Sequence, residues 1–195
     1  TPIDYYGVEG RTYTLEVSGV DADGDGVAET YSASSFMTPS VAIDKVLIGF
    51  HATWELWQVL LYAKDPADTD NYYMFKVWRN DSLVNDALDE VSLADDAFFD
   101  GSEVNGVWVM ALDPKIEGEK MAKGDMVTLE MACIDKPFYD FLVGLQEETS
   151  PKNPLFSGPP ANVPGNISNG AIGIFAAYSV DRDSALVTMD VENFK

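Results

Sequence analysis

Hydrophobic and polar residues alternate with a period of two along most of the chain, which is the pattern of half-buried β-strands. Residues 12–18 and 29–37 alternate in this way on either side of an Asp- and Gly-rich segment, so they predict a β-hairpin. Residues 56–63 are apolar at both alternating positions, which is typical of a central strand. Further strands are predicted at residues 41–50, 72–78, 104–112, 126–134, 171–180 and 185–191. The last two should pair around a turn at residues 181–184, and the polar stretch 80–101 should be a long excursion between strands.

One segment has the period of a helix instead. From Phe138, apolar residues recur at i, i+3, i+4 and i+7, and Asp135 stands where a helix N-cap belongs. These signals predict a helix over residues 135–148. With about nine strands and this one helix, the chain is predicted to be all-β, an immunoglobulin- or fibronectin-like sandwich forming a single domain over residues 1–195.

The charge balance narrows the choice of partners. The chain carries 33 acidic residues against 12 Lys and Arg, a formal net charge of −21. Such a surface repels nucleic-acid phosphates and anionic lipid headgroups, so no nucleic acid is expected as a partner. The sequence also contains no phosphate loop, dinucleotide fingerprint, metalloprotease motif or Gly-x-Ser-x-Gly elbow. We therefore predict a non-enzymatic protein without catalytic or cofactor-binding residues.

The segment between the first two predicted strands is the best candidate for an ion site. Residues 21–29, here called the acidic loop, read Asp-Ala-Asp-Gly-Asp-Gly-Val-Ala-Glu. Alternate carboxylates in a tight coil point inward, and a glycine permits the bend that presents the next carbonyl oxygen. A structural Ca²⁺ is therefore the predicted occupant. Its predicted ligands are Asp21, Asp23, Asp25, Val27 and Glu29.

The kind of calcium loop can be narrowed further. A helix-loop-helix calcium hand needs a bidentate Glu at its twelfth position, which is Ser32 in this chain, and its flanks should be helical. Glu29, at the ninth position, instead resembles the closing ligand of the hairpin calcium loops in integrin-type propeller repeats. The alternative is a solvated Asp/Gly turn without metal, because the same residues favour turns on their own.

Aromatic residues give a second candidate surface. His51 lies close in sequence to Trp54 and Trp57, and Trp78 and Trp108 lie further along the chain. An exposed strip of such rings could stack on sugars, whereas buried rings would only fill the core. His51 has no second histidine and no serine nucleophile motif to work with, so a structural role is favoured for it.

For two further groups of candidate residues, an explanation without a functional role is favoured. Asp95, Asp96 and Asp100 could form a glycosidase pair, but clustered Asp is expected in so acidic a chain. Cys133, the only cysteine, lies in an apolar run and is expected to fill the core.

The second half of the chain also resembles a known family. The resemblance rests on the following segments: Gly124-Asp125, Ile134-Asp135, Phe138-Tyr139-Asp140-Phe141, Asn153-Pro154-Leu155-Phe156-Ser157, Pro160-Ala161-Asn162-Val163, Asn166-Ile167-Ser168 and residues 170–179. Residues 65–67, 71–73 and 95–101 extend it into the middle of the chain. These segments resemble a family of Bacteroidetes cell-envelope lipoproteins that is catalogued only as a domain of unknown function (family 4249).

The resemblance implies a setting rather than a reaction. It implies an outer-membrane-anchored protein of the cell envelope, periplasmic or surface-exposed, that binds a ligand or a TonB-dependent outer-membrane receptor as an accessory of uptake. A calcium-supported glycan-binding module is the alternative. Members of the family also have an N-terminal β domain and a lipidated cysteine, absent from residues 1–195. Contact with the membrane is therefore expected only through a lipid anchor upstream of Thr1. Members usually have a short turn in place of the acidic loop, so calcium is not implied by the family.

Overall fold

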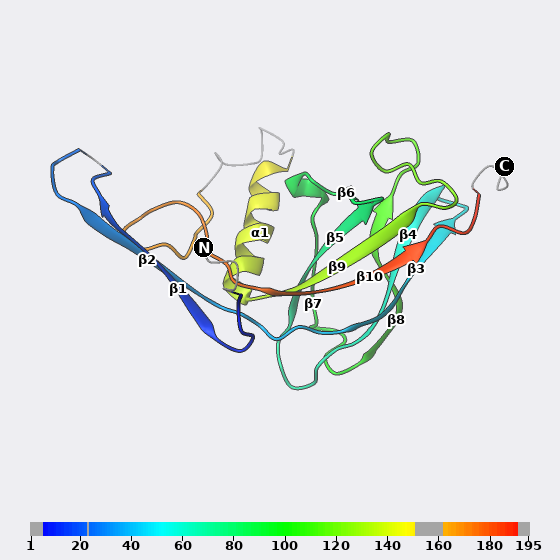
Figure 1. Cartoon of the computed structure of the whole chain (residues 1–195), viewed down its shortest axis with the longest axis horizontal. Helices are drawn as coiled ribbons and strands as arrows, with labels where there is room; N and C mark the ends of the chain where they lie inside the picture. The colour runs from blue at the N-terminus through cyan, green and yellow to red at the C-terminus, as the bar shows by residue number, and fades with distance from the viewer. Residues whose placement is uncertain (1–5, 23, 151–161, 191–195) are drawn as a thin grey trace, which may run out of the picture. The chain divides into compact units, whose positions relative to one another are not determined.

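The protein is mostly β, as predicted (Figure 1). The computed structural model describes residues 6–22, 24–150 and 162–190. Within these residues there are ten strands, one α-helix and one short 3-10 helix. The elements are β1 Thr12–Val20, β2 Glu29–Phe36, β3 Ile43–His51, β4 Leu56–Lys64, β5 Tyr72–Arg79, β6 Ser82–Leu83, η1 Leu88–Glu90, β7 Ser92–Asp95, β8 Glu103–Leu112, β9 Met126–Ile134, α1 Lys136–Thr149 and β10 Ser179–Leu186.

The chain's internal contacts divide it into two compact units. The first joins Thr1–Pro39 to Ile134–Ser179, and the second joins Ser40–Cys133 to Val180–Lys195. That the chain forms a single domain stays a prediction.

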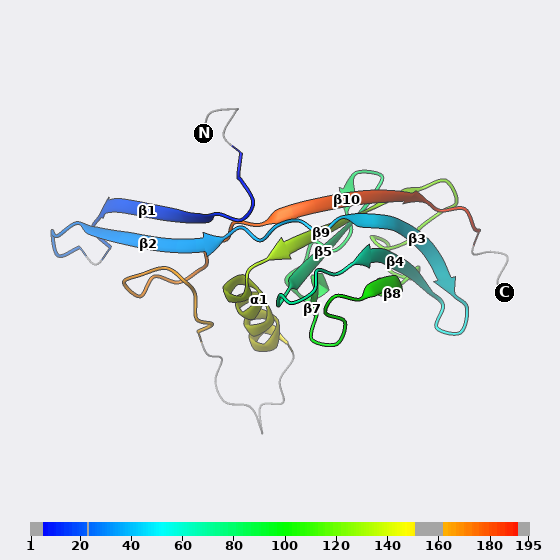
Figure 2. The ribbon, with the colours of Figure 1, turned by 90° about the horizontal axis from the view of Figure 1, so that it is seen from below.

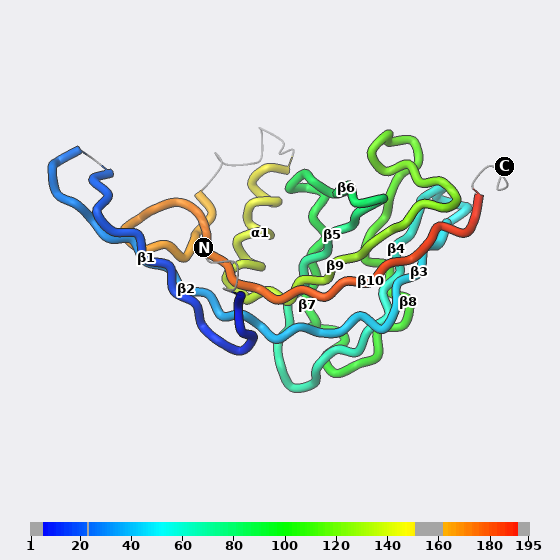
Figure 3. Tube along the Cα trace, viewed as in Figure 1, coloured from blue at the N-terminus to red at the C-terminus, as the bar shows by residue number. Residues whose placement is uncertain are grey.

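The first unit contains the predicted hairpin. β1 and β2 pair antiparallel, with Thr12 opposite Phe36, and form a two-stranded ribbon (Figure 2). The other edge of β2 is bonded to a loop from far along the chain, which runs beside β2 in Figure 3. The Ser32 main chain exchanges 2.8 Å bonds with Ser168, and Asn169 Nδ2 donates to the Thr30 carbonyl oxygen at 2.7 Å. Residues distant in sequence therefore complete one edge of this ribbon.

Helix α1 begins where the sequence predicted. Asp135 is its N-cap, and Asp135 Oδ1 accepts a 3.1 Å bond from the Phe138 N–H. Its Oδ2 accepts bonds from Ser35 Oγ at 2.7 Å and from the Phe36 N–H at 3.1 Å. One carboxylate thus caps the helix and holds it against β2.

A close backbone contact fixes another part of the first unit. A Cβ atom added to Gly165 would lie 1.8 Å from the carbonyl oxygen of Gly173. Since no real Cβ contact is that short, only glycine fits at residue 165 without a backbone shift.

The second unit is a sandwich of two sheets. One sheet has the order β3-β4-β8, and the other has the order β10-β9-β5-β6, with β7 also paired to β5. The central strand β4 lies where it was predicted: Trp57, Val59, Leu61 and Ala63 are buried, and the residues between them are half-buried. Buried side chains of both sheets form one hydrophobic core, which includes Cys133 at 1% exposure. Cys133 therefore fills the core as expected.

The predicted C-terminal hairpin is wrong. Residues 181–184, assigned to its turn, lie inside the single strand β10, which pairs with β9, and residues 171–178 form no strand. The charged residues alternate with the strand period. Asp181 and Asp183 are half-buried and accept 2.7 and 2.9 Å bonds from the main-chain N–H groups of Ile43 and Val46. The acidic side chains of this polar run bind main-chain N–H groups of strand β3. The run is therefore part of a strand, although its composition predicts a turn.

The excursion at 80–101 also carries more structure than predicted. It contains β6, η1 and β7, and both strands pair with β5.

Candidate functional site

The acidic loop lies at the tip of the β1–β2 hairpin, as predicted. Asp21 accepts bonds from the N–H groups of Gly24 (2.8 Å) and Gly26 (3.0 Å). Asp25 Oδ1 accepts a 2.7 Å bond from the N–H of Val27. The bond at Asp25 is that of an Asx turn, and the two bonds at Asp21 close wider turns, so main-chain N–H groups already bind both carboxylates.

The remaining predicted ligands are less informative. Glu29 Oε2 accepts a 2.6 Å bond from the hydroxyl of Tyr31. Val27 is exposed, and the ligand predicted from it is its main-chain carbonyl oxygen. Asp23 lies outside the described residues. Calcium binding at the acidic loop therefore stays a prediction.

Three of the aromatic residues singled out from the sequence come together on the second unit. His51 ends β3, Trp54 lies in the β3–β4 turn and Trp108 lies on β8. The ring centroids of His51 and Trp54 are 4.4 Å apart, and those of Trp54 and Trp108 are 5.5 Å apart. We call His51, Trp54 and Trp108 the aromatic cluster. Trp57 is not part of it, because its side chain is fully buried.

The geometry of the aromatic cluster is that of one ring lying over two. The rings of His51 and Trp108 are within 8° of parallel, with centroids 6.2 Å apart. Trp54 lies above both rings at van der Waals separation, which accounts for its two centroid distances. Its sideways offsets from the two rings add up to about the spacing between His51 and Trp108. Trp54 is nevertheless 60% exposed. One face of its indole ring is therefore covered, and the other is open to solvent.

Hydrogen bonds fix the aromatic cluster in place. The main-chain N–H of Trp54 donates to His51 Nδ1 at 3.2 Å, so a neutral His51 ring carries its proton on Nε2. Trp108 Nε1 donates to the Met110 carbonyl oxygen at 2.6 Å. Glu55, the residue after Trp54, forms an exposed 2.9 Å ion pair with Lys115. The Trp54 ring thus lies against residues of β3 and β8, and a charged pair follows it directly in sequence.

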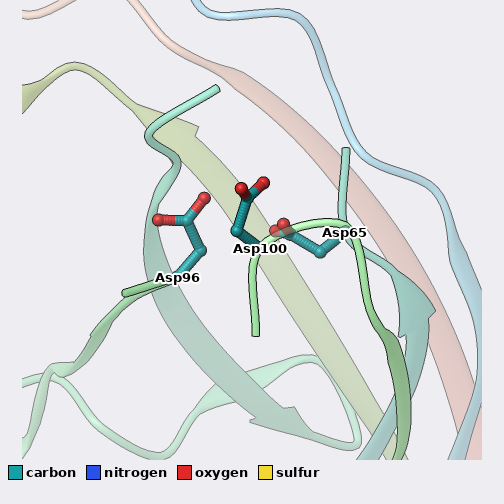
Figure 4. A group of neighbouring side chains, drawn as sticks. All are labelled: Asp65, Asp96 and Asp100. Carbon is teal, nitrogen blue, oxygen red and sulfur yellow. The ribbon is translucent and has the colours of Figure 1, made fainter. Parts of the chain in front are cut away.

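A second assembly of functional side chains brings residues together from separate loops. Asp65 follows β4, whereas Asp96 and Asp100 follow β7, and one carboxylate oxygen of each lies within 4.8 Å of the others (Figure 4). In Figure 4 Asp100 lies between the other two. We call these residues the aspartate cluster. Of the three, only Asp96 and Asp100 were candidates from sequence. Asp65 was missed, although its place directly after a buried strand was a usable signal.

The aspartate cluster is bound by neutral donors. Asp65 accepts bonds from the Tyr73 hydroxyl and from the Gly101 N–H. Asp96 Oδ2 accepts bonds from both the main-chain and side-chain nitrogens of Asn71, at 2.9 and 3.1 Å. Burial, and after it the hydrogen bond to Asp65, raises the pKa of Tyr73 well above its usual range, so the phenol stays a neutral donor.

This arrangement does not resemble a glycosidase pair. Such enzymes need two carboxyl groups that flank a sugar ring from opposite sides. Asp96 is only 5% exposed and is held by Asn71, and Asp95 lies apart from the cluster, with its Oδ1 bonded to the N–H of Ala97. We therefore give the aspartate cluster no catalytic role.

The fold and these sites define an acidic, mostly β protein with an exposed aromatic side chain, Trp54, on its second unit. The chain belongs to the family described as Domain of unknown function (DUF4249), whose model matches residues 2–184. Comparison with the curated proteins finds no match, and neither does comparison with the solved structures. No helix in the described part of the chain has the length and apolar character to span a membrane.

Proposed function

We propose that the chain is a non-enzymatic binding domain of a Bacteroidetes outer-membrane lipoprotein, accessory to a TonB-dependent uptake system. Membership of the family supports this setting, through the cell-envelope lipoproteins that the sequence resembles. The net charge of −21 supports a surface that stays soluble and attracts basic partners or cations. The protein would face the periplasm or the outside of the cell.

The ligand that the geometry supports best is a saccharide. The carrying observation is Trp54, which is 60% exposed although one face of its ring is stacked on His51 and Trp108. A large amphipathic ring held open in this way offers an apolar plane to the C–H face of a sugar. The polar side chains of Glu55 and Lys115 beside it can bond to the sugar hydroxyls.

Calcium has a structural part in this scheme. The acidic loop forms the tip of the β1–β2 hairpin. A calcium ion bound there would stiffen that tip.

A glycan array followed by calorimetry on the best hits tests the saccharide proposal. Trp54→Ala should reduce affinity at least about tenfold, the effect of losing roughly 1.4 kcal/mol of stacking. The matched control is Phe98→Ala, which removes a fully exposed aromatic ring from the same unit. An array without hits, or equal losses in the two variants, would exclude a saccharide site at Trp54.

The receptor half of the proposal needs its own experiment. Cross-linking in intact cells, with the full-length lipoprotein as bait, should recover a TonB-dependent outer-membrane receptor. If repeated cross-linking never yields such a receptor, the accessory role in uptake is wrong, whatever the array shows.

A further inference from the structure

A cavity of about 220 Å³ opens into the second unit, at the edge strands β7 and β8 of its two sheets. Its floor includes Leu61, Tyr73 and Met131, each at most 4% exposed. The less buried part of its lining, here called the mouth, includes Ala94 of β7 and Val104 of β8. Most of the lining is apolar, so the cavity offers a small ligand a hydrophobic interior that is reachable from solvent.

The polar side chains of the cavity leave it short of hydrogen-bond donors. The Tyr73 hydroxyl is bonded to Asp65, and both Ser92 Oγ and Trp108 Nε1 donate to main-chain carbonyl oxygens. The carboxylates of Asp65 and Glu103 also line the cavity, and carboxylates accept only. A ligand that matches these groups must therefore bring donors of its own.

The charge at the inner end of the cavity points the same way. Asp65 belongs to both the cavity lining and the aspartate cluster. Asp65 and Asp96 are 3% and 5% exposed, and among the residues that the structure describes no Lys, Arg or His forms an ion pair with the cluster. Buried carboxylates in proteins are normally paired with a positive charge. A cationic head on the ligand would supply that charge.

An organic cation fits the surroundings better than a metal ion does. A hard divalent cation takes six to eight oxygen ligands, roughly, and holds waters where the protein offers fewer. The cavity that Asp65 lines is instead walled mostly by apolar side chains, Phe75 among them. These walls favour a ligand whose charged head continues into an apolar body.

We propose that this cavity is a binding site for a small amphipathic amine, with its ammonium group at Asp65 and its apolar body between the two sheets. The volume suits a body of roughly six to ten carbon atoms, by comparison with the cavity of about 150 Å³ that holds benzene. The site shares Trp108 with the aromatic cluster, but it takes a different class of ligand from the saccharide surface at Trp54.

The experiment is calorimetry on the whole chain with three probes that share one body. 2-Phenylethylamine, 2-phenylethanol and phenylacetate differ in having a cationic, a neutral and an anionic head. The amine should bind about tenfold or more tightly than the alcohol, because a hydrogen bond to a buried charge is stronger than one between neutral groups. Phenylacetate should not bind. In Asp65→Asn the preference for the amine over the alcohol should fall towards onefold.

A second variant tests the cavity without touching its charge. Ala94→Phe places a ring in the mouth and should abolish binding of both the amine and the alcohol. Ala111→Phe, at an exposed position of β8 outside the cavity, is the matched control and should change neither affinity. Circular dichroism confirms that each variant is folded before its titration is compared.

Three results would overturn the proposal. The first is that no amine in a series from propylamine to octylamine, nor 2-phenylethylamine, binds at millimolar concentration. The second is equal affinity for the amine, alcohol and acid probes. The third is that Ca²⁺ or Mg²⁺ alone binds in an Asp65-dependent manner and displaces the amine, which would assign the aspartate cluster to a metal.

Discussion

The ion pair between Glu130 and Arg182 gives the sharpest test of how burial determines stability in the second unit. Glu130 Oε2 accepts bonds from Arg182 Nε at 2.7 Å and from Nη2 at 2.5 Å. The Glu130 side chain is 5% exposed and that of Arg182 is 58% exposed. The guanidinium also lies over the ring of Trp78, 5.1 Å from its centroid. Arg182→Met removes these interactions and leaves a buried carboxylate without its cation.

The size of the effect follows from the unequal burial of the two partners. Breaking a fully buried pair costs about 3–5 kcal/mol, but exposure of Arg182 screens part of the attraction. We therefore expect Arg182→Met to lower the free energy of unfolding by about 2–3 kcal/mol, including a small contribution from Trp78. For a chain of this size the melting temperature should fall by about 5–10 °C.

Urea unfolding followed by tryptophan fluorescence is the appropriate assay, because all four tryptophans lie in the second unit. The matched control is Lys64→Met, which breaks an exposed ion pair with Glu103 (3.9 Å) and should change stability by less than about 0.5 kcal/mol. Changing Glu130 to Met as well as Arg182 should recover most of the loss, since an apolar pair no longer buries a charge. Equal losses in the two single variants would refute the argument from burial.

Three further predictions concern other parts of the chain. Gly165→Ala should destabilise the first unit by at least about 2 kcal/mol, because its Cβ would overlap a main-chain carbonyl oxygen. Hydrogen exchange measures this loss of stability. The control is Gly118→Ala, which should be nearly neutral because the added Cβ lies in open space. Because the pKa of Tyr73 is raised on folding, only the unfolded chain releases this proton just above about pH 10. The contribution of Tyr73 to stability should therefore be constant below that pH and fall above it. Tyr73→Phe should remove that alkaline loss, and should cost about 1–3 kcal/mol at neutral pH by leaving Asp65 without its donor; an alkaline loss that is unchanged in Tyr73→Phe would assign it to another group. Calcium at tenfold its Kd should add about 1.4 kcal/mol to stability, which thermal melts with and without chelator measure. Asp23→Ala should abolish this increment. If calcium does not stabilise the unmodified chain, the acidic loop is not a calcium site.

Local signals in the sequence predicted the elements whose contacts are local. The apolar run at residues 56–63 became β4, the hairpin around the acidic loop became β1 and β2, and Asp135 caps α1. In each case the deciding interactions lie within a few residues, or follow directly from strand or helix periodicity.

The incorrectly predicted C-terminal hairpin shows that local sequence composition does not always distinguish a strand from a turn. Residues 181–184 contain three charges and a serine, which is the composition of a turn. Their alternation is meaningful only beside β3 and β9, where Asp181 and Asp183 bond to main-chain N–H groups and Arg182 bonds to Glu130. Those partners are more than 50 residues away in sequence, so nothing nearby distinguished the strand from a turn.

The candidate sites also differ in how far they depend on contacts between residues distant in sequence. The aromatic cluster was half visible in sequence, since His51 and Trp54 are three residues apart, but Trp108 joins them only across the sheet formed by β3, β4 and β8. In the aspartate cluster the decisive step is tertiary: Asp65 meets Asp96 and Asp100 because the loops after β4 and β7 converge. Composition alone predicted many acidic groups and offered no reason to prefer this trio over the acidic loop. The burial of Asp65 and Asp96 supplies that reason, because a carboxylate enclosed beside an apolar cavity needs a counter-charge that an exposed one takes from water.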